Sequence, residues 1–179
     1  MEIDWIHRPD TLNVCFNALD RHVIHGRADA VALRPDGERP TTFARLLEEV
    51  AAFGGVLRAF GVGVGDRVRS GLTGRDGLVV LLACLRVGAT FVRDDSAAVA
   101  MPGGGVVRRG GQGDELDWDV VLRAGRTDPA PCAEVRADAP AIEADGRTVS
   151  TGELLESSTG WPYDALARLL AGEPVTMAP

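Results

Sequence analysis

Three stretches in close succession decide the fold: Thr41-Thr-Phe-Ala-Arg-Leu-Leu-Glu-Glu-Val50, Gly61-Val-Gly-Val-Gly-Asp-Arg-Val68 and Leu82-Ala-Cys-Leu-Arg-Val-Gly-Ala89. The first begins a run of apolar residues at spacings of three and four that reaches Phe60, which predicts a helix. The second predicts a tight turn that opens a strand, and the third contains the end of a predicted helix over 78–87 that is apolar nearly all round. Helix, strand and helix in this order form one crossover unit of a parallel sheet.

The glycine spacing of the second stretch invites a comparison with dinucleotide-binding loops. Such a loop follows a strand and opens a helix, so that its glycines bring the pyrophosphate to the helix N-terminus. Here the glycines follow a helix and open a strand. We therefore expect no nucleotide at this turn.

The segments around these stretches add further elements. Apolar spacing and turn residues predict helices over 11–23, 116–124 and 163–170 and strands over 30–34 and 90–93. The polar face of the first helix is expected to carry Asn13, Asn17, Asp20 and Arg21. The tail over 172–179 is expected to be loose. The predicted fold class is α/β, with a mainly parallel sheet covered by helices on both faces.

A hairpin is predicted over 141–149, because Asp145-Gly146 suits a two-residue turn between strands. Ser150 or Thr151 is then placed to cap a short helix. Strand, Asp-Gly turn, strand, cap and helix repeat the pattern of residues 30–47. The end of the chain thus reads as a second ββα unit.

Composition excludes several classes of partner. The chain of 179 residues has a formal charge of −7 and a pI near 4.9, so it lacks the basic surface that nucleic acid or an anionic membrane requires. No apolar run approaches the roughly 20 residues that span a bilayer, and the N-terminus does not read as a signal peptide. We expect one globular domain in the cytoplasm, with no nucleic acid and no membrane as partners.

All 19 basic residues are arginines, and the sequence contains no lysine. A phosphate-loop lysine, a Schiff-base lysine and a lysine that closes over an adenylate are therefore excluded within these residues. Arginine preference in a genome rich in G and C accounts for the bias, but the chemical exclusion holds whatever its cause.

Metal and redox sites are not indicated by the sequence. The cysteines stand far apart without a C-x-x-C pair, so they are expected to be reduced and structural: Cys15, Cys84 and Cys132. The histidines lie near one end without a ligand pattern: His7, His22 and His25. We predict no metal.

A family resemblance rests on four stretches. Asn13-Val-Cys-Phe-Asn-Ala-Leu-Asp-Arg-His-Val23 resembles a signature of acetyl- and propionyl-CoA synthetases in the adenylate-forming, AMP-binding superfamily, and 61–68, 82–89 and 108–111 are similar to later family segments. The resemblance covers about residues 5–125 and continues only in outline. It implies a truncated, degenerate N-terminal part of such a synthetase.

The resemblance also implies a domain division and a candidate ligand contact. Residues 1–126 would form the synthetase-like α/β domain, 127–140 a proline-rich linker, and 141–179 a ββα-like segment on the same domain. Arg108 and Arg109 resemble residues near the phosphates of coenzyme A, and an arginine beside glycine amides can hold an anion. The other interpretation is a flexible surface loop with two solvated arginines. Apart from CoA or an adenine nucleotide here, we expect no cofactor.

The phosphate loop of the family has no counterpart in this sequence. A family member would have a Ser/Thr/Gly-rich loop ending in Gly-x-Pro-Lys-Gly after the position of Pro140. This chain has the predicted hairpin instead, and Ser150-Thr-Gly152 is a vestige at most. No catalytic residue is therefore predicted, and we expect no enzyme activity of the chain on its own.

Three functions from different classes remain. The favoured one is a non-catalytic relative of acyl-CoA synthetases that binds a protein partner, such as a synthetase or another pathway enzyme, or that self-associates. The second is one subunit of a split adenylate-forming enzyme, which would act as an acid-CoA ligase once a partner supplies the loop. The third is a binder of acyl-CoA or nucleotide near Arg108 and Arg109.

Overall fold

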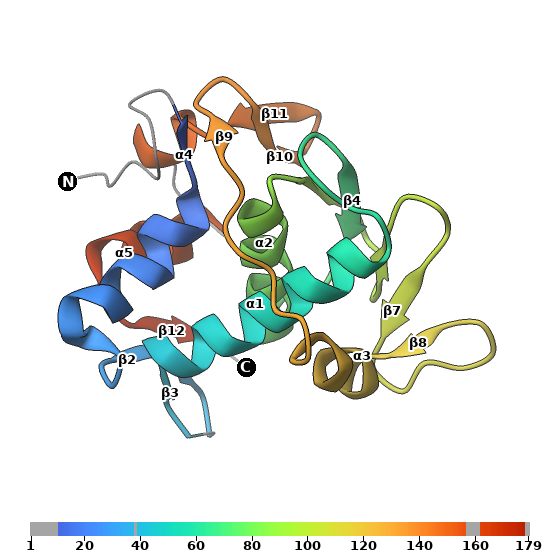
Figure 1. Ribbon diagram of the computed structural model, residues 1–179, viewed down its shortest axis with the longest axis horizontal. Helices are drawn as coiled ribbons and strands as arrows, with labels where there is room; N and C mark the ends of the chain where they lie inside the picture. Colours follow the sequence, from blue (N-terminus) through green and yellow to red (C-terminus); the bar gives the residue numbers. More distant parts are fainter. Residues whose placement is uncertain (1–10, 38, 157–161, 178–179) are drawn as a thin grey trace.

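The computed structural model describes residues 11–37, 39–156 and 162–177. Their largest sheet has seven strands, in the order β11 (Arg147–Ser150), β10 (Pro140–Ala144), β5 (Thr90–Arg93), β4 (Arg67–Ser70), β6 (Val99–Ala100), β7 (Val106–Arg108) and β8 (Leu116–Asp117). Helices α1 (Phe43–Ala59) and α2 (Gly74–Val87) lie side by side in the middle of the molecule (Figure 1).

The predicted helix, strand and helix are present as α1, β4 and α2, and α2 connects β4 to its parallel neighbour β5. The Thr42 hydroxyl accepts a hydrogen bond from the Arg45 N–H and so caps α1, as predicted, while α2 ends at Gly88 with a φ of 78°. Strands β10, β5 and β4 pair in parallel, and β11, β6 and β7 join through antiparallel pairs. The α/β class is confirmed, in a mixed sheet with a parallel centre.

The two faces of this sheet differ in burial. One cross-strand row is almost completely buried and joins the main core with α2: Val68, Phe91, Ile142 and Val149. The neighbouring row on the opposite face is half-buried or exposed: Glu143, Val92, Arg69, Ala100 and Val106. We call this second set the open row.

Helix α2 is longer than its apolar pattern indicates. The prediction of a helix over 78–87 was short by one turn, because the structure begins it at Gly74 after an extended Thr73. This first turn contains two glycines and the polar pair Arg75 and Asp76. Such residues carry no apolar periodicity, so the pattern could not reveal them.

The start of the chain differs from the prediction in two ways. Residues 11–12 form strand β1 (Thr11–Leu12), which pairs with β9 (Val135–Arg136), and the helix begins after it and continues through the π-type turns η1 (Phe16–Asp20) and η2 (Val23–Arg27). Asn13 and Asn17 are buried rather than on a polar face. Their side chains are satisfied by main-chain partners, for example Asn17 Nδ2 by the Asn13 carbonyl at 3.0 Å.

The prediction of a loose tail over 172–179 is wrong for residues 175–177, and residues 178–179 lie outside the described residues. Residues Val175–Met177 form β12, which pairs in parallel with β2 (Val31–Pro35), while β3 (Thr41–Thr42) pairs with the other edge of β2. Pairing with β2 gives the tail hydrogen-bond partners that its own composition does not reveal.

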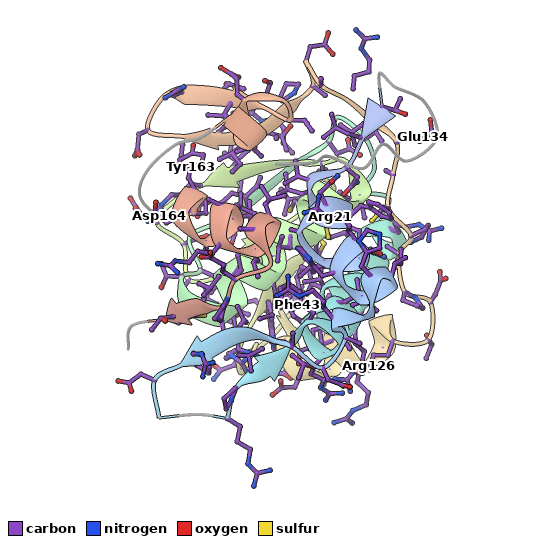
Figure 2. The ribbon with its side chains drawn as sticks, turned by 90° about the vertical axis from the view of Figure 1, so that its left-hand side faces the viewer. Arg21, Phe43, Arg126, Glu134, Tyr163 and Asp164 are labelled. Atoms are coloured by element: carbon purple, nitrogen blue, oxygen red, sulfur yellow. The ribbon has the colours of Figure 1, made fainter. Side chains whose placement is uncertain are left out.

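Helix α5 (Tyr163–Ala171) packs beside η1 and covers the N-terminal helix. Arg21 lies between these helices (Figure 2), and its Nη2 donates to the Leu170 carbonyl at 2.7 Å. His22 Nε2 lies 2.8 Å from the Leu169 carbonyl, and burial lowers the pKa of His22 below its ordinary value. The second half of the chain therefore closes onto the first.

The segment after α3 (Trp118–Gly125) is held firmly against the body. Ala130 N–H donates to the Ala51 carbonyl at 2.9 Å, and Ala133 N–H donates to the Arg86 carbonyl at 2.8 Å. The division at residues 126 and 140 stays a prediction, but these bonds tie the intervening segment to both α1 and α2. None of the described helices is long and apolar enough to cross a membrane.

Helices α1 and α3 approach closely through glycine, which yields a stability prediction. A methyl group at Gly55 would overlap the Asp128 carbonyl oxygen. Gly55→Ala should therefore cost about 1–3 kcal/mol of unfolding free energy in urea denaturation, although Ala normally favours a helix by about 1 kcal/mol. Gly63→Ala is the control, because a methyl group there meets open space. Equal stability of the two variants would contradict the close packing.

Candidate functional site

The predicted anion contact lies where β7 passes through a glycine turn into β8. Arg109 binds Asp76 with both ends of its guanidinium group, Nε to Oδ2 at 2.5 Å and Nη2 to Oδ1 at 2.9 Å. Its guanidinium carbon lies 5.5 Å from the centroid of the Trp118 ring. The hydrogen bond that Arg109 donates to Asp76 contributes most to raising the pKa of Arg109 above its usual value.

The surroundings of Arg109 already supply negative charge. Asp119 Oδ1 lies 3.4 Å from Arg109 Nη1, and the Gly110 N–H donates to Asp117 at 2.9 Å. Backbone N–H groups of Val120 and Gly110 lower the pKa of Asp117, which also caps α3. A phosphate arriving here would have to displace Asp76 and face the remaining carboxylates.

Arg108 points to a different partner. Its Nε lies 3.6 Å from Glu115 Oε2, and both side chains are partly exposed. The two arginines are neighbours in the sequence, but the structure pairs them with different acidic residues. Their assignment as CoA contacts stays a prediction.

The hairpin predicted at the phosphate-loop position is confirmed. Strands β10 and β11 pair antiparallel up to Ala144 opposite Arg147, and the two turn residues Asp145 and Gly146 have φ values of 52° and 73°. Ser150 and Glu153 then form a capping box: Glu153 Oε2 accepts the Ser150 N–H at 2.7 Å, and Ser150 Oγ accepts the Glu153 N–H at 3.3 Å. This box begins α4 (Glu153–Glu156).

A small cavity lies beside the hairpin. The cavity at its base has a volume of about 10 Å³ and is lined by Val14, Leu85, Gly88, Ala89, Val135, Pro140, Ala141 and Thr151. A volume of this size holds about one water molecule. A nucleoside phosphate does not fit there.

A buried charged cluster joins distant parts of the chain, and we call it the Arg86 junction: Asn13, Cys15, Asp20, Arg86 and Cys132. Arg86 binds Asp20 through Nη1 to Oδ2 at 2.8 Å and Nη2 to Oδ1 at 3.1 Å, and its Nε donates to the Ala130 carbonyl at 2.6 Å. Burial disfavours the charge of Arg86, but its partners, Cys15 and Asp20 foremost, raise its pKa above the usual value. The guanidinium group therefore stays charged.

Asn13 completes the junction through its side-chain amide. Its Nδ2 lies within hydrogen-bond distance of the carbonyls of Leu85 at 2.9 Å, Arg86 at 3.0 Å and Ala133 at 2.9 Å. Its Oδ1 accepts the Phe16 N–H at 3.1 Å. One buried amide thus connects the first helix, the end of α2 and the segment before β9.

The junction also brings together two cysteines that lie far apart in the sequence, Cys15 and Cys132. Cys15 Sγ, Cys132 Sγ and a carboxylate oxygen of Asp20 lie within 4.8 Å of one another. Sequence reasoning missed this cluster because residues 15 and 132 are far apart along the chain. Cys84, wholly buried elsewhere in the core, has its pKa raised by burial.

Comparison with known proteins supports one family. The chain is 33% identical to acetyl-coenzyme A synthetase of Streptomyces coelicolor over an alignment of 135 residues, which covers 60% of this chain and 21% of the relative. It is 38% identical over 96 residues to that of Drosophila melanogaster, covering 50% and 14%. No family model matches.

Solved structures agree in fold. The Brucella canis acyl-CoA synthetase superimposes with a TM-score of 0.71 at 18% identity, over 97% of this chain and 44% of that chain. An artificially fused adenylation-PCP di-domain NRPS from Klebsiella oxytoca gives 0.68 at 19% identity, over 93% and 40%. The resemblance to acyl-CoA synthetases is confirmed.

The similarity to acyl-CoA synthetases is partial in extent. The chain spans about a fifth or less of the length of the synthetases just named, and less than half of the two solved chains. Within this acyl-CoA synthetase-like fold, the stretches 13–23 and 82–89 meet at the Arg86 junction. Much of the resemblance therefore lies in residues that hold the fold together.

The Arg86 junction yields a stability prediction. Arg86→Met leaves the Asp20 carboxylate and the Ala130 carbonyl without their cation, so the free energy of unfolding should fall by about 3–5 kcal/mol. The matched control is Arg67→Met, which removes an arginine 54% exposed that binds Glu143 at 2.7 Å; such a surface pair contributes about 0–1 kcal/mol. Chemical denaturation measures both. Similar losses would show that the junction is energetically an ordinary surface pair.

Proposed function

We propose that this chain does not activate carboxylic acids by itself and acts by binding a protein partner, such as an acyl-CoA synthetase or another enzyme of the same pathway. The observation that carries the proposal is the β10–β11 hairpin. It closes with a two-residue turn at the position where the resemblance puts the phosphate loop.

Adenylation depends on the groups that a phosphate loop would supply at the position of this hairpin. Attack of a carboxylate on the α-phosphate needs preorganised donors and cations around the developing charge and the leaving pyrophosphate. The sequence has no lysine, and Arg109 is bound by Asp76. The cavity beside the hairpin holds about 10 Å³. These features together disfavour ATP binding in the manner of a synthetase.

The open row supports a partner. Three of its members are apolar and half-buried, namely Val92, Ala100 and Val106. The exposed Arg69 lies in the middle of the row, between Val92 and Ala100, and Glu143 is at one end. Arginine is enriched at protein interfaces, and here it is flanked by partly buried apolar side chains. We propose that the partner packs on this face of the sheet.

The catalytic half of the proposal is tested by ATP–pyrophosphate exchange. The purified chain with Mg²⁺, ATP and acetate or propionate should show no exchange above a protein-free blank and should form no acyl-CoA. An Arg109→Gln variant should behave identically. Exchange that depends on the added acid would contradict the proposal. Activity that appears only with a second chain would favour the split enzyme instead.

A further inference from the structure

The thiols of the Arg86 junction are positioned as a pair rather than as isolated core residues. Cys15 is completely buried at the start of the first helix, and Cys132 is half-buried in the extended segment before β9. Their sulfur atoms lie within 4.8 Å of each other. The only other cysteine, Cys84, is no member of this cluster.

The two backbones that carry the thiols are fixed relative to each other. Thr11 pairs with Arg136 and Leu12 with Val135, so an antiparallel ladder begins three residues from either cysteine. On the other side of Cys132, Arg86 Nε holds the Ala130 carbonyl at 2.6 Å. Side-chain rotation can therefore bring the sulfurs together while both segments stay in place.

A metal ion is a poor fit to the same atoms. Two sulfurs and one carboxylate resemble a partial zinc set, but Arg86 Nη1 lies 3.0 Å from Cys132 Sγ and 2.8 Å from Asp20 Oδ2. The guanidinium group already supplies the positive charge among these ligands. A divalent cation would have to displace a buried arginine, which is held by the Ala130 carbonyl as well.

We propose that Cys15 and Cys132 form an oxidation site that a hydroperoxide converts to an intramolecular disulfide. Cys132 is the thiol that solvent reaches, so it reacts first. Cys15, buried behind it, is the resolving thiol.

The reaction balances in two steps. The Cys132 thiol takes one oxygen atom from the hydroperoxide and becomes a sulfenic acid, while the peroxide is reduced to its alcohol, or to water for hydrogen peroxide. The Cys15 thiol then attacks the Cys132 sulfur, the S–S bond forms and water leaves. Two thiol hydrogens are lost and one peroxide is consumed per disulfide.

The electrostatic surroundings of Cys132 make its oxidation slow in the resting protein. The hydrogen bond with Cys15 and burial raise the pKa of Cys132, whereas Arg86 acts in the opposite direction. Cys132 is therefore held as a thiol until an oxidant accumulates. Arg86 keeps its contacts with Asp20 and Ala130 after the sulfurs have joined, so the junction has no need to open.

The test treats the reduced full chain with equimolar hydrogen peroxide and maps its peptides without reductant. We expect one linked pair of peptides, containing residues 15 and 132 and lighter by two hydrogens than their sum. Thiol titration in denaturant should fall from three groups to one, since all three cysteines start free. The midpoint of thermal unfolding should rise, because the bond closes a long loop.

Variants separate this result from general thiol oxidation. Cys84→Ala should still form the disulfide, whereas Cys15→Ser should stop at a sulfenic acid on Cys132 that dimedone traps. Retention of three thiols, a bond between two molecules, or a linkage through Cys84 would overturn the proposal. Stoichiometric Zn²⁺ binding by the reduced chain that protects both thiols would also overturn it.

Discussion

The buried guanidinium group of Arg86 is the constraint on which the remaining structure depends. A charge in a nearly dry environment requires partners on every side, and Asp20, the Ala130 carbonyl and Cys132 provide them from two other segments. Satisfying this one group therefore fixes the first helix and the segment before β9 against α2. Asn13 reinforces the same arrangement through three carbonyls.

This junction gives a physical meaning to the sequence resemblance. Asn13 and Asp20 belong to one resembling stretch and Arg86 to another, and Gly65 in a third donates its N–H to the Gly88 carbonyl at 3.0 Å. These residues join separate segments of the fold. A chain can thus keep a clear similarity to acyl-CoA synthetases while a tight hairpin stands where the resemblance puts the phosphate loop.

Local patterns predicted what local interactions determine. The helix after Thr42, the strand through Val68 and the Asp145-Gly146 hairpin follow from spacing, caps and turn residues within each segment. Asn13 was misplaced because its partners come from residues far along the chain. Val175–Met177 was missed for the same reason, since only the edge of β2 orders it. The pairing of Arg109 with Asp76 likewise joins the turn after β7 to the distant first turn of α2, so the sequence alone did not reveal the partner of this arginine.

Binding of a protein partner is the central claim, and isolation of the tagged chain from its own cells tests it most directly. Co-isolated proteins are quantified by mass at low and high salt, for the native chain, for Arg69→Glu in the open row, and for Arg34→Glu on an exposed position of β2. The account predicts a synthetase or pathway enzyme in near-equal molar amount, lost with Arg69→Glu and kept with Arg34→Glu. Recovery of the chain alone at low salt would contradict this account. Co-isolation of the same amount of partner with the Arg69→Glu variant would contradict it as well.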